Sequence, residues 1–231
     1  MAPKKRIPSS IQSLEDLAAI KHAMAGVFQD AQLNLTSHRK LVVVLRNIQL
    51  RAIELGLQGS FNLTFAKLIN LILPLKKGEK AADRIAKFSS AFVSAILKDE
   101  QKQREEDGMN DEDHDETPGS EFIEFLVHHL LRGTDAKDKN VRYRVVQLLA
   151  YFVNYITEID EELFQALHYS LRNRLKDKES NVRIQAIVAI SRFQFFELAD
   201  DDENANGDNK KHMNSATKSL LTALENDDVP E

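Results

Sequence analysis

The sequence predicts an all-α protein built from stacked pairs of helices, and two observations lead to this prediction. Leu, Ala, Lys, Glu and Ile dominate, whereas the 231 residues include only 8 Gly and 5 Pro, a composition that favours helices. The tripeptide Asn140-Val141-Arg142 recurs as Asn181-Val182-Arg183. This offset of 41 residues indicates an internal repeat.

Apolar positions on both sides of the repeated tripeptide follow the same offset. The matched pairs are Phe122 with Leu163, Leu126 with Leu167, Leu130 with Leu171, Val145 with Ala186, Leu149 with Ile190 and Phe152 with Phe193. Two amphipathic helices in each period of about 40–47 residues are typical of HEAT or armadillo repeats. We therefore expect a HEAT-repeat α-solenoid, in which antiparallel helix pairs stack as a right-handed superhelix. Asp177 and Arg183 flank the turn between two helices and suit an Asp–Arg ladder along the stack, although the first copy has Ala136 in place of the acid.

Four helices are expected in the first half of the chain, from their apolar stripes and their ends. They cover residues 13–29, 38–55, 60–74 and 79–97. Ser13 is the expected N-cap of the first helix, Gly56 ends the second as a C′ glycine, and Pro74 ends the third. The expected buried stripe of the second helix is Leu41, Val44, Leu45, Ile48 and Ala52.

Five helices are expected in the second half. They cover residues 121–132, 139–157, 161–175, 180–198 and 213–225. Asp160 is the expected N-cap of the third of these. The chain stops just after the last helix, where a second helix of the same repeat should begin. A solenoid that ends within a repeat exposes an apolar end, so we expect an N-terminal piece of a longer protein.

Charge divides the chain into segments that the net charge of −5 conceals. Residues 1–98 carry +9, residues 99–121 carry −9, residues 122–199 carry +1 and residues 200–231 carry −6. The expected organisation is a disordered tail (1–12), two diverged HEAT repeats (13–98), an acidic disordered insert (99–119), two HEAT repeats (120–199), an acidic loop (200–211) and the start of a truncated repeat (212–231). The first folded part is therefore basic, and the acidity lies in the spacer and the tail.

The insert contains two short motifs. Asp111, Asp113 and Asp115 alternate as in a calcium-binding loop, but Glu116 and Phe122 stand where an EF-hand needs Gly and a bidentate Glu. We therefore expect no calcium site. Thr117-Pro118 is a minimal proline-directed phosphorylation motif, which two residues alone do not establish.

No motif points to an enzyme or to a bound cofactor. The sequence has no Cys, no Gly-rich phosphate loop and no metalloprotease or hydrolase signature. His128 and His129 are neighbours on a helix, point about 100° apart and do not suit one metal ion. No run of 18 apolar residues could span a membrane. Lys4-Lys5-Arg6 fits either a nuclear-localisation patch or an ordinary solvated tail.

The basic residues carry the functional signal, because they gather at helix starts and at the turns between helices. The candidates for contact with a nucleic acid are Lys76, Lys77, Lys80, Arg84, Arg39, Lys40, Lys139, Arg142, Arg144 and Arg174. Lys137, Lys176 and Lys178 crowd the same turns, where Arg142 and Arg183 could instead be structural ladder residues. Equivalent turns of a solenoid line up along one edge, so positive charge there could follow a phosphate backbone without reading bases. The alternative is a protein–protein scaffold or transport-type adaptor whose groove binds a peptide and makes no direct DNA contact.

Several segments resemble a known family. They are His38-Arg39-Lys40, Ile72-Leu73-Pro74-Leu75-Lys76-Lys77, Asp83-Arg84-Ile85, Asn140-Val141-Arg142-Tyr143-Arg144-Val145, Glu158-Ile159-Asp160 and Asn181-Val182-Arg183-Ile184-Gln185-Ala186. Together they resemble the N-terminal region of the HEAT-repeat CAP-G subunit of condensin, over about residues 20–195. The second and the last segment are the most specific, because generic HEAT repeats do not share them in this order.

The resemblance implies a curved solenoid that binds the kleisin subunit of condensin along a groove. It implies that the two subunits together hold double-stranded DNA without sequence preference and anchor the complex to chromosomes in the nucleus during mitosis. In the family the basic patch that faces DNA includes the lysines after Leu-Pro-Leu, which here are Lys76 and Lys77. The other basic candidates are our extension from charge position. The chain would supply only the first repeats, so much of the kleisin groove would be absent.

Overall fold

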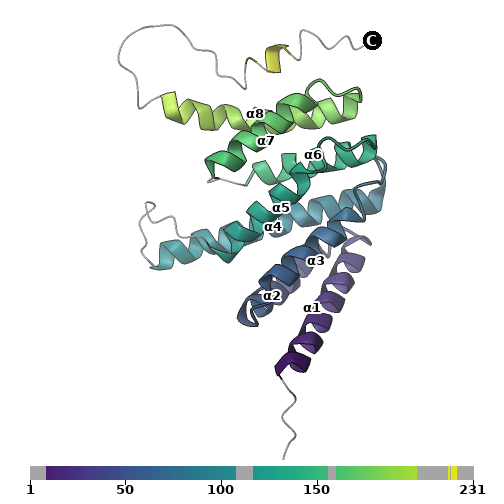
Figure 1. The fold of residues 1–231 in the computed structure, drawn as a ribbon, viewed down its shortest axis with the longest axis vertical. Coiled ribbons are helices and arrows are strands. Elements are labelled where there is room, and N and C mark those ends of the chain that lie inside the picture. Colours follow the sequence, from purple (N-terminus) through teal and green to yellow (C-terminus); the bar gives the residue numbers. More distant parts are fainter. Residues whose placement is uncertain (1–8, 108–116, 156–159, 202–217, 219, 223–231) are drawn as a thin grey trace, which may run out of the picture. The chain divides into compact units, whose positions relative to one another are not determined.

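The computed structural model describes residues 9–107, 117–155, 160–201, 218 and 220–222 (Figure 1). The main helices are α1 (Ser9–Ala31), α2 (His38–Glu54), α3 (Gln58–Asn70), α4 (Lys80–Asp107), α5 (Pro118–Leu131), α6 (Lys139–Val153), α7 (Glu161–Arg174) and α8 (Ser180–Asp201). No strand occurs in this described part of the chain. The all-α prediction is therefore confirmed.

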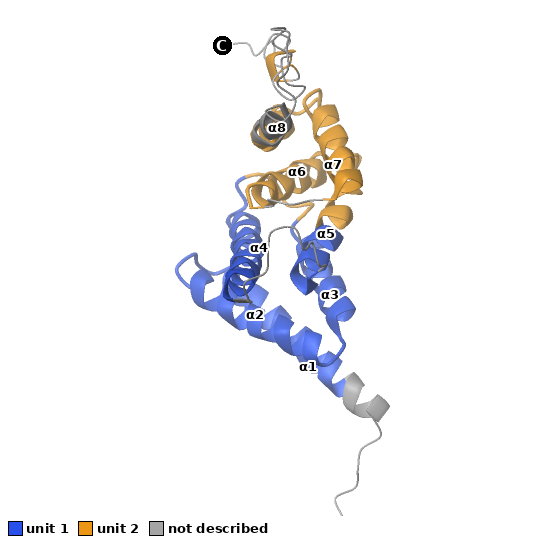
Figure 2. Cartoon of the chain, turned by 90° about the vertical axis from the view of Figure 1, so that its left-hand side faces the viewer, with its two compact units in different colours: residues 1–72, 78–126 blue, residues 73–77, 127–231 orange. Residues whose placement is uncertain are grey.

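The chain divides into two compact units (Figure 2). Unit 1 comprises residues 1–72 and 78–126, and unit 2 comprises residues 73–77 and 127–231. The division falls within α5. The short segment 73–77 belongs to unit 2, although the residues on both sides of it belong to unit 1.

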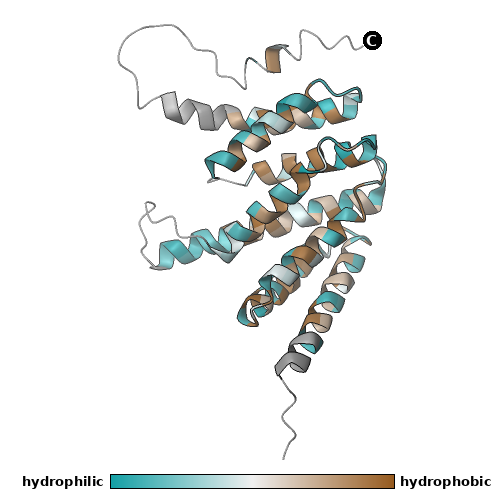
Figure 3. Ribbon diagram, in the orientation of Figure 1, coloured by the Kyte–Doolittle hydropathy of each residue, from teal (hydrophilic) through white to brown (hydrophobic). Residues whose placement is uncertain are grey.

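Within each unit, helices that hold the same place in successive pairs pack on one another. In unit 1, α1 packs on α3 and α2 packs on α4, while α1 and α2 form a pair. In unit 2, α6 packs on α8, and α7 pairs with α8. Apolar and polar patches alternate along the helices, as amphipathic packing requires (Figure 3). This is the like-on-like stacking of HEAT repeats.

The core of unit 1 is built from phenylalanines. Phe65 lies 5.1 Å from Phe122, 5.3 Å from Phe28 and 5.5 Å from Phe92 between ring centroids, and each of these side chains is buried. Edge-to-face and offset contacts of this kind add to the free energy gained from burial. The aromatic cluster thus joins α1, α3, α4 and the start of α5.

The 41-residue register is confirmed by burial. Each of the twelve residues in the six matched pairs is at most 2% exposed. The same two faces of the repeat therefore point into the core in both copies, as the offset predicts.

The prediction of the buried stripe of α2 was wrong in part. Val44 is 45% exposed, and the residues buried on this helix are His38, Val42, Leu45, Gln49 and Ala52. The His38 ring contacts the carbonyl oxygen of Ala31 through Nε2 at 2.9 Å. Gln49 accepts a hydrogen bond from Arg46 at 2.7 Å. His38 finds its partner at the end of α1 and the Gln49 side-chain oxygen finds its partner on α2 itself, so both occupy buried positions that an apolar pattern would leave to the surface.

Several predicted helix ends also differ. The helix α1 begins at Ser9, so Ser13 lies inside it, and α3 ends at Asn70, four residues before Pro74. The expected disorder of residues 99–107 is wrong, because α4 continues to Asp107. Glu100 on this extension accepts hydrogen bonds from the Thr117 hydroxyl at 2.7 Å and the Gly119 amide at 2.9 Å. These contacts give the extension a tertiary partner within unit 1.

Two predicted ends are confirmed. Gly56 has φ +67°, and the amides of Gly56 and Leu57 donate to the carbonyls of Ile53 and Ala52, which closes α2 as a Schellman motif. The Asp160 carboxylate accepts the Leu163 amide at 3.1 Å and caps α7. The Lys4-Lys5-Arg6 patch, residues 108–116 of the expected insert, the expected acidic loop from residue 202 and most of the truncated repeat lie outside the described residues.

Candidate functional site

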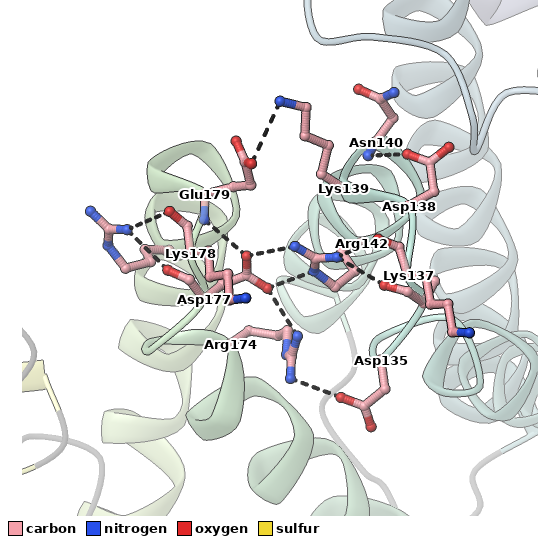
Figure 4. A network of polar contacts seen from close by, with 12 residues as sticks. Asp135, Lys137, Asp138, Lys139, Asn140, Arg142, Arg174, Asp177, Lys178 and Glu179 are labelled. Atoms are coloured by element: carbon pink, nitrogen blue, oxygen red, sulfur yellow. Dashed lines mark hydrogen bonds and ion pairs between the residues drawn. The ribbon is translucent and has the colours of Figure 1, made fainter.

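The Asp177 carboxylate joins two successive inter-helix turns of unit 2 (Figure 4). Arg142, at the start of α6, donates from Nε to Oδ2 of Asp177 at 2.7 Å and from Nη2 to Oδ1 at 3.0 Å. This is the bidentate geometry that suits a guanidinium and a carboxylate. The predicted Asp–Arg ladder is therefore present, and its cross-repeat link joins Asp177 to Arg142 of the preceding repeat.

Arg174, at the end of α7, forms a second link between the same turns. Its Nη1 donates to Asp177 at 2.9 Å, and its Nη2 donates to Asp135 at 2.8 Å. Burial by itself raises the pKa of Asp177, but the hydrogen bonds from Arg142 and from the Glu179 amide, with the two arginine charges, hold that pKa below its ordinary value. Asp177 is therefore a carboxylate at neutral pH, and both arginines are engaged by it.

Arg142 and Arg183 hold equivalent places in the repeat, and each binds the backbone of the turn that precedes its helix. Nη1 of Arg142 donates to the carbonyl oxygens of Ala136 and Lys137 at 2.9 and 3.0 Å. Nη1 of Arg183 donates to the carbonyl oxygens of Asp177 and Lys178 at 3.0 and 3.4 Å. Each arginine thus binds the residues five and six positions before it, so the 41-residue repeat extends to individual hydrogen bonds.

Arg144 is fully buried, with 0% exposure, and its expected contact with a nucleic acid needs correction. Its Nε donates to the Leu75 carbonyl at 3.1 Å, and its Nη2 donates to the Lys76 carbonyl. Its Nη1 donates to Gln147 at 2.9 Å. A phosphate needs an exposed donor, so Arg144 acts on the segment 73–77 from within unit 2.

The segment 73–77 brings two exposed lysines to the start of α8. Nζ of Lys77 donates to Oδ1 of Asn181 at 2.6 Å, across 104 residues of sequence. Lys76 is exposed beside it. On the neighbouring turn, Nζ of Lys139 lies 3.5 Å from Glu179. Unit 2 therefore gathers lysines from two separate parts of the chain around the starts of α6 and α8.

The remaining basic candidates lie in unit 1, at the starts of α2 and α4. Arg39, Lys40 and Lys80 are exposed. Arg84 is half-buried and donates to the Gln32 carbonyl at 2.8 Å, which places the first turn of α4 against the end of α1. His38, at the start of α2, packs against Phe88 of α4 with ring centroids 5.4 Å apart. The two helix starts therefore lie at the same end of unit 1.

The basic residues predicted to contact a nucleic acid thus fall into two groups, one in each unit. Residues of the same group have different roles. Unit 2 holds Lys76, Lys77, Lys139, Arg142, Arg144 and Arg174, and unit 1 holds Arg39, Lys40, Lys80 and Arg84. Sequence reasoning considered a structural ladder role for Arg142 but missed the structural roles of Arg144 and Arg174. The repeat itself gives the signal for Arg142, which stands six residues after Ala136 as Arg183 stands six residues after Asp177.

No metal-binding cluster and no membrane-spanning helix occurs among the described residues. No group of three or more His, Asp or Glu residues there could hold a metal ion. No described helix is long and apolar enough to cross a membrane. Burial and the charge of Arg132 lower the pKa of His129, so that ring is neutral at pH 7.

Comparison with known proteins gives consistent relatives, although no family model matches the chain. The chain is 40% identical over 92% of its length to condensin complex subunit 3 of Saccharomyces cerevisiae, and 28% identical over 93% of its length to that of Homo sapiens. The crystal structure of the Schizosaccharomyces pombe condensin Cnd3-Cnd2 subcomplex matches 88% of the chain with a TM-score of 0.65 at 30% identity.

The match covers only part of each relative. The chain spans about a fifth of the length of these proteins: 20% of the S. cerevisiae subunit, 18% of the human subunit and 21% of the matched S. pombe chain. The stacking of helix pairs, the 41-residue repeat and these relatives agree. The chain belongs to the condensin complex subunit 3 family of HEAT-repeat proteins.

Proposed function

We propose that this chain is part of a condensin subunit that holds double-stranded DNA by its phosphate backbone, together with the kleisin subunit. The similar S. pombe structure is that of a Cnd3-Cnd2 subcomplex, which supports a partner subunit for this chain as well. The role is one of binding rather than catalysis. The place of action is the chromosome, in the nucleus, during mitotic condensation.

The arrangement of lysines in unit 2 carries the proposal. Lys77 is held at the start of α8, while Lys139 is held at Glu179 in the turn just before that helix. Lys76 and Lys77 are exposed, and Arg144 binds the carbonyl oxygens of Leu75 and Lys76 from inside the unit. Cationic side chains near helix N-termini are suited to phosphate oxygens, because the unpaired amides there also favour anions. Such contacts position a backbone and carry no base specificity.

Charge reversal tests the proposal. In the double variant Lys76→Glu/Lys77→Glu, we expect weaker binding to all duplex sequences alike, since phosphate contacts are lost. The slope of log affinity against log salt should fall by about 2, one for each lost contact. Fluorescence anisotropy with two unrelated duplexes, at several salt concentrations and with and without the kleisin subunit, measures both quantities.

The matched control reverses two exposed lysines elsewhere. Lys21 lies on α1 and Lys67 lies on α3, and neither belongs to the candidate set. The variant Lys21→Glu/Lys67→Glu changes the net charge by the same amount, so it should retain most of the affinity and the salt slope. An equal loss of DNA affinity in the two variants would show that net charge alone explains the weaker binding. Unchanged binding by Lys76→Glu/Lys77→Glu, with kleisin still bound, would favour a peptide-binding scaffold without DNA contact.

A further inference from the structure

Three arginines of unit 2 each bind two consecutive backbone carbonyls, and the second carbonyl always belongs to an exposed lysine. Arg142 binds Ala136 and Lys137, and Arg183 binds Asp177 and Lys178. Arg144 binds Leu75 and Lys76. We call Arg142, Arg144 and Arg183 the turn arginines, and Lys76, Lys137 and Lys178 the held lysines.

The turn arginines differ from the held lysines in exposure. Arg144 has no exposed surface, and the Arg142 side chain is 13% exposed and bound to the carboxylate of Asp177. Lys76, Lys137 and Lys178 are all exposed. The guanidinium groups therefore face the backbone of the turns, and the ammonium groups are the ones that solvent or a ligand can reach.

The three held segments are also connected to one another. The turn of Lys137 is joined to the turn of Lys178 through Arg142 and Asp177. The segment of Lys76 is joined to α6 by Arg144 and to the start of α8 by Lys77 and Asn181. One hydrogen-bonded framework thus fixes the backbone of all three lysines within unit 2.

We propose that the turn arginines are positioning residues, which present the held lysines as a preorganised set of cations to the phosphates of a DNA duplex. This inference rests on the proposed function and adds Lys137 and Lys178 to its contact residues. A loop that is already ordered does not lose backbone freedom when it binds, so each fixed turn strengthens phosphate binding without touching the ligand.

Arg144→Lys provides the test, because it keeps the positive charge but replaces the fork that reaches two carbonyls with a single ammonium group. We expect the affinity for random duplex DNA to fall about fivefold, the order of one lost preorganised contact. The salt slope should stay within about one unit of the native value, since no arginine–phosphate contact is lost. Amide exchange at Lys76, Lys77 and Gly78 should become faster.

A double-mutant cycle separates positioning from direct contact. In the Lys76→Gln/Lys77→Gln background, Arg144→Lys should change the affinity by less than about twofold, because the side chains that it positions are gone. If Arg144→Lys weakens binding equally in both backgrounds, or leaves it unchanged in the native one, the positioning role is refuted. If Lys76→Gln/Lys77→Gln has no effect on its own, the proposed function fails instead.

If the Arg144→Lys variant does not fold, the same experiment is carried out with Arg183→Lys. The second substitution of that double-mutant cycle is Lys178→Gln, and hydrogen exchange is measured at the amides of Lys178 and Glu179. Coupling of the two substitutions supports the inference, and additivity overturns it. Circular dichroism and thermal unfolding of every variant show that the fold is retained.

Discussion

At the scale of single residues, burial separates two roles that positively charged side chains can take. Lys76 is exposed, whereas Arg144, which binds its backbone, has no exposed surface. Both count as positive charge in the sequence. Arginine suits the interior because its planar fork satisfies several acceptors at once, and lysine suits a surface that meets phosphate as a mobile point charge.

The same scale gives a prediction for Asp177, whose side chain is 2% exposed and faces two arginines. Asp177→Asn keeps the shape but removes the negative charge from a buried pair. We expect the free energy of unfolding at pH 7 to fall by about 3 kcal/mol. Asp135→Asn is the control, because the Asp135 side chain is 79% exposed, and its loss should stay under about 1 kcal/mol.

The pH dependence of the same pair follows from the lowered pKa of Asp177. The folded protein binds this proton less tightly than the unfolded chain does, so the stabilisation is fully present above the unfolded-state pKa of about 3.9. It disappears as the pH falls through the lower folded-state pKa. The gap in stability between the native chain and Asp177→Asn should therefore narrow below about pH 4. Urea titrations from pH 3 to 7 measure it, and a constant gap would contradict the assignment.

At the scale of elements, helix ends depend on local backbone geometry. Gly56 has φ +67°, and the Schellman motif that it forms closes α2 before α3 begins. An L-residue with a Cβ is strained in this left-handed conformation. The end of α2 therefore depends on the absence of a side chain at this position.

Gly56→Ala should lower the free energy of unfolding by about 1 kcal/mol, the cost of a left-handed conformation for alanine. Gly26→Ala is the matched control, because Gly26 lies within α1 and a Cβ there would meet nothing within 4 Å. It should raise stability by about 0.5–1 kcal/mol, since alanine is the better helix former. Thermal unfolding of both variants checks the contrast, and a change of the same sign in both would contradict it.

At the scale of the whole molecule, a repeat array distributes its stability over neighbouring repeats. Each repeat packs mainly on the next, so a local substitution is expected to act locally. The chain follows this pattern, because α1 to α4 form contacts in unit 1 and α6 to α8 form contacts in unit 2. One free energy of unfolding for the whole chain would average over the two units and hide differences in their stability.

Hydrogen exchange of the Asp177→Asn variant tests this locality. Amides of α6, α7 and α8 should exchange faster than in the native chain, because their turns lose a shared carboxylate. Amides of α1, α2 and α3 should keep their native rates. Uniform acceleration across all six helices would indicate one cooperative unit instead of separable ones.

The helical class, the HEAT repeat and its register follow from the order of residues alone. These depend on local periodicity and on an offset of 41 residues, both of which are visible in the order of residues. Gly56 and Asp160 were predictable for the same reason, since the turn or cap that each forms lies within a few residues. Lys76 and Lys77 are proposed as DNA contacts from a motif rather than from their surroundings.

Which charged and polar groups are buried depends instead on contacts between distant parts of the chain. Arg144 lies 68 residues from Lys76 in sequence, and Lys77 lies 104 residues from Asn181. Such partners leave no periodic signal, so Arg144 resembled a surface cation. A polar group can be buried only where a partner satisfies its hydrogen bonds, and it is the stacking of distant helices that brings those partners within reach.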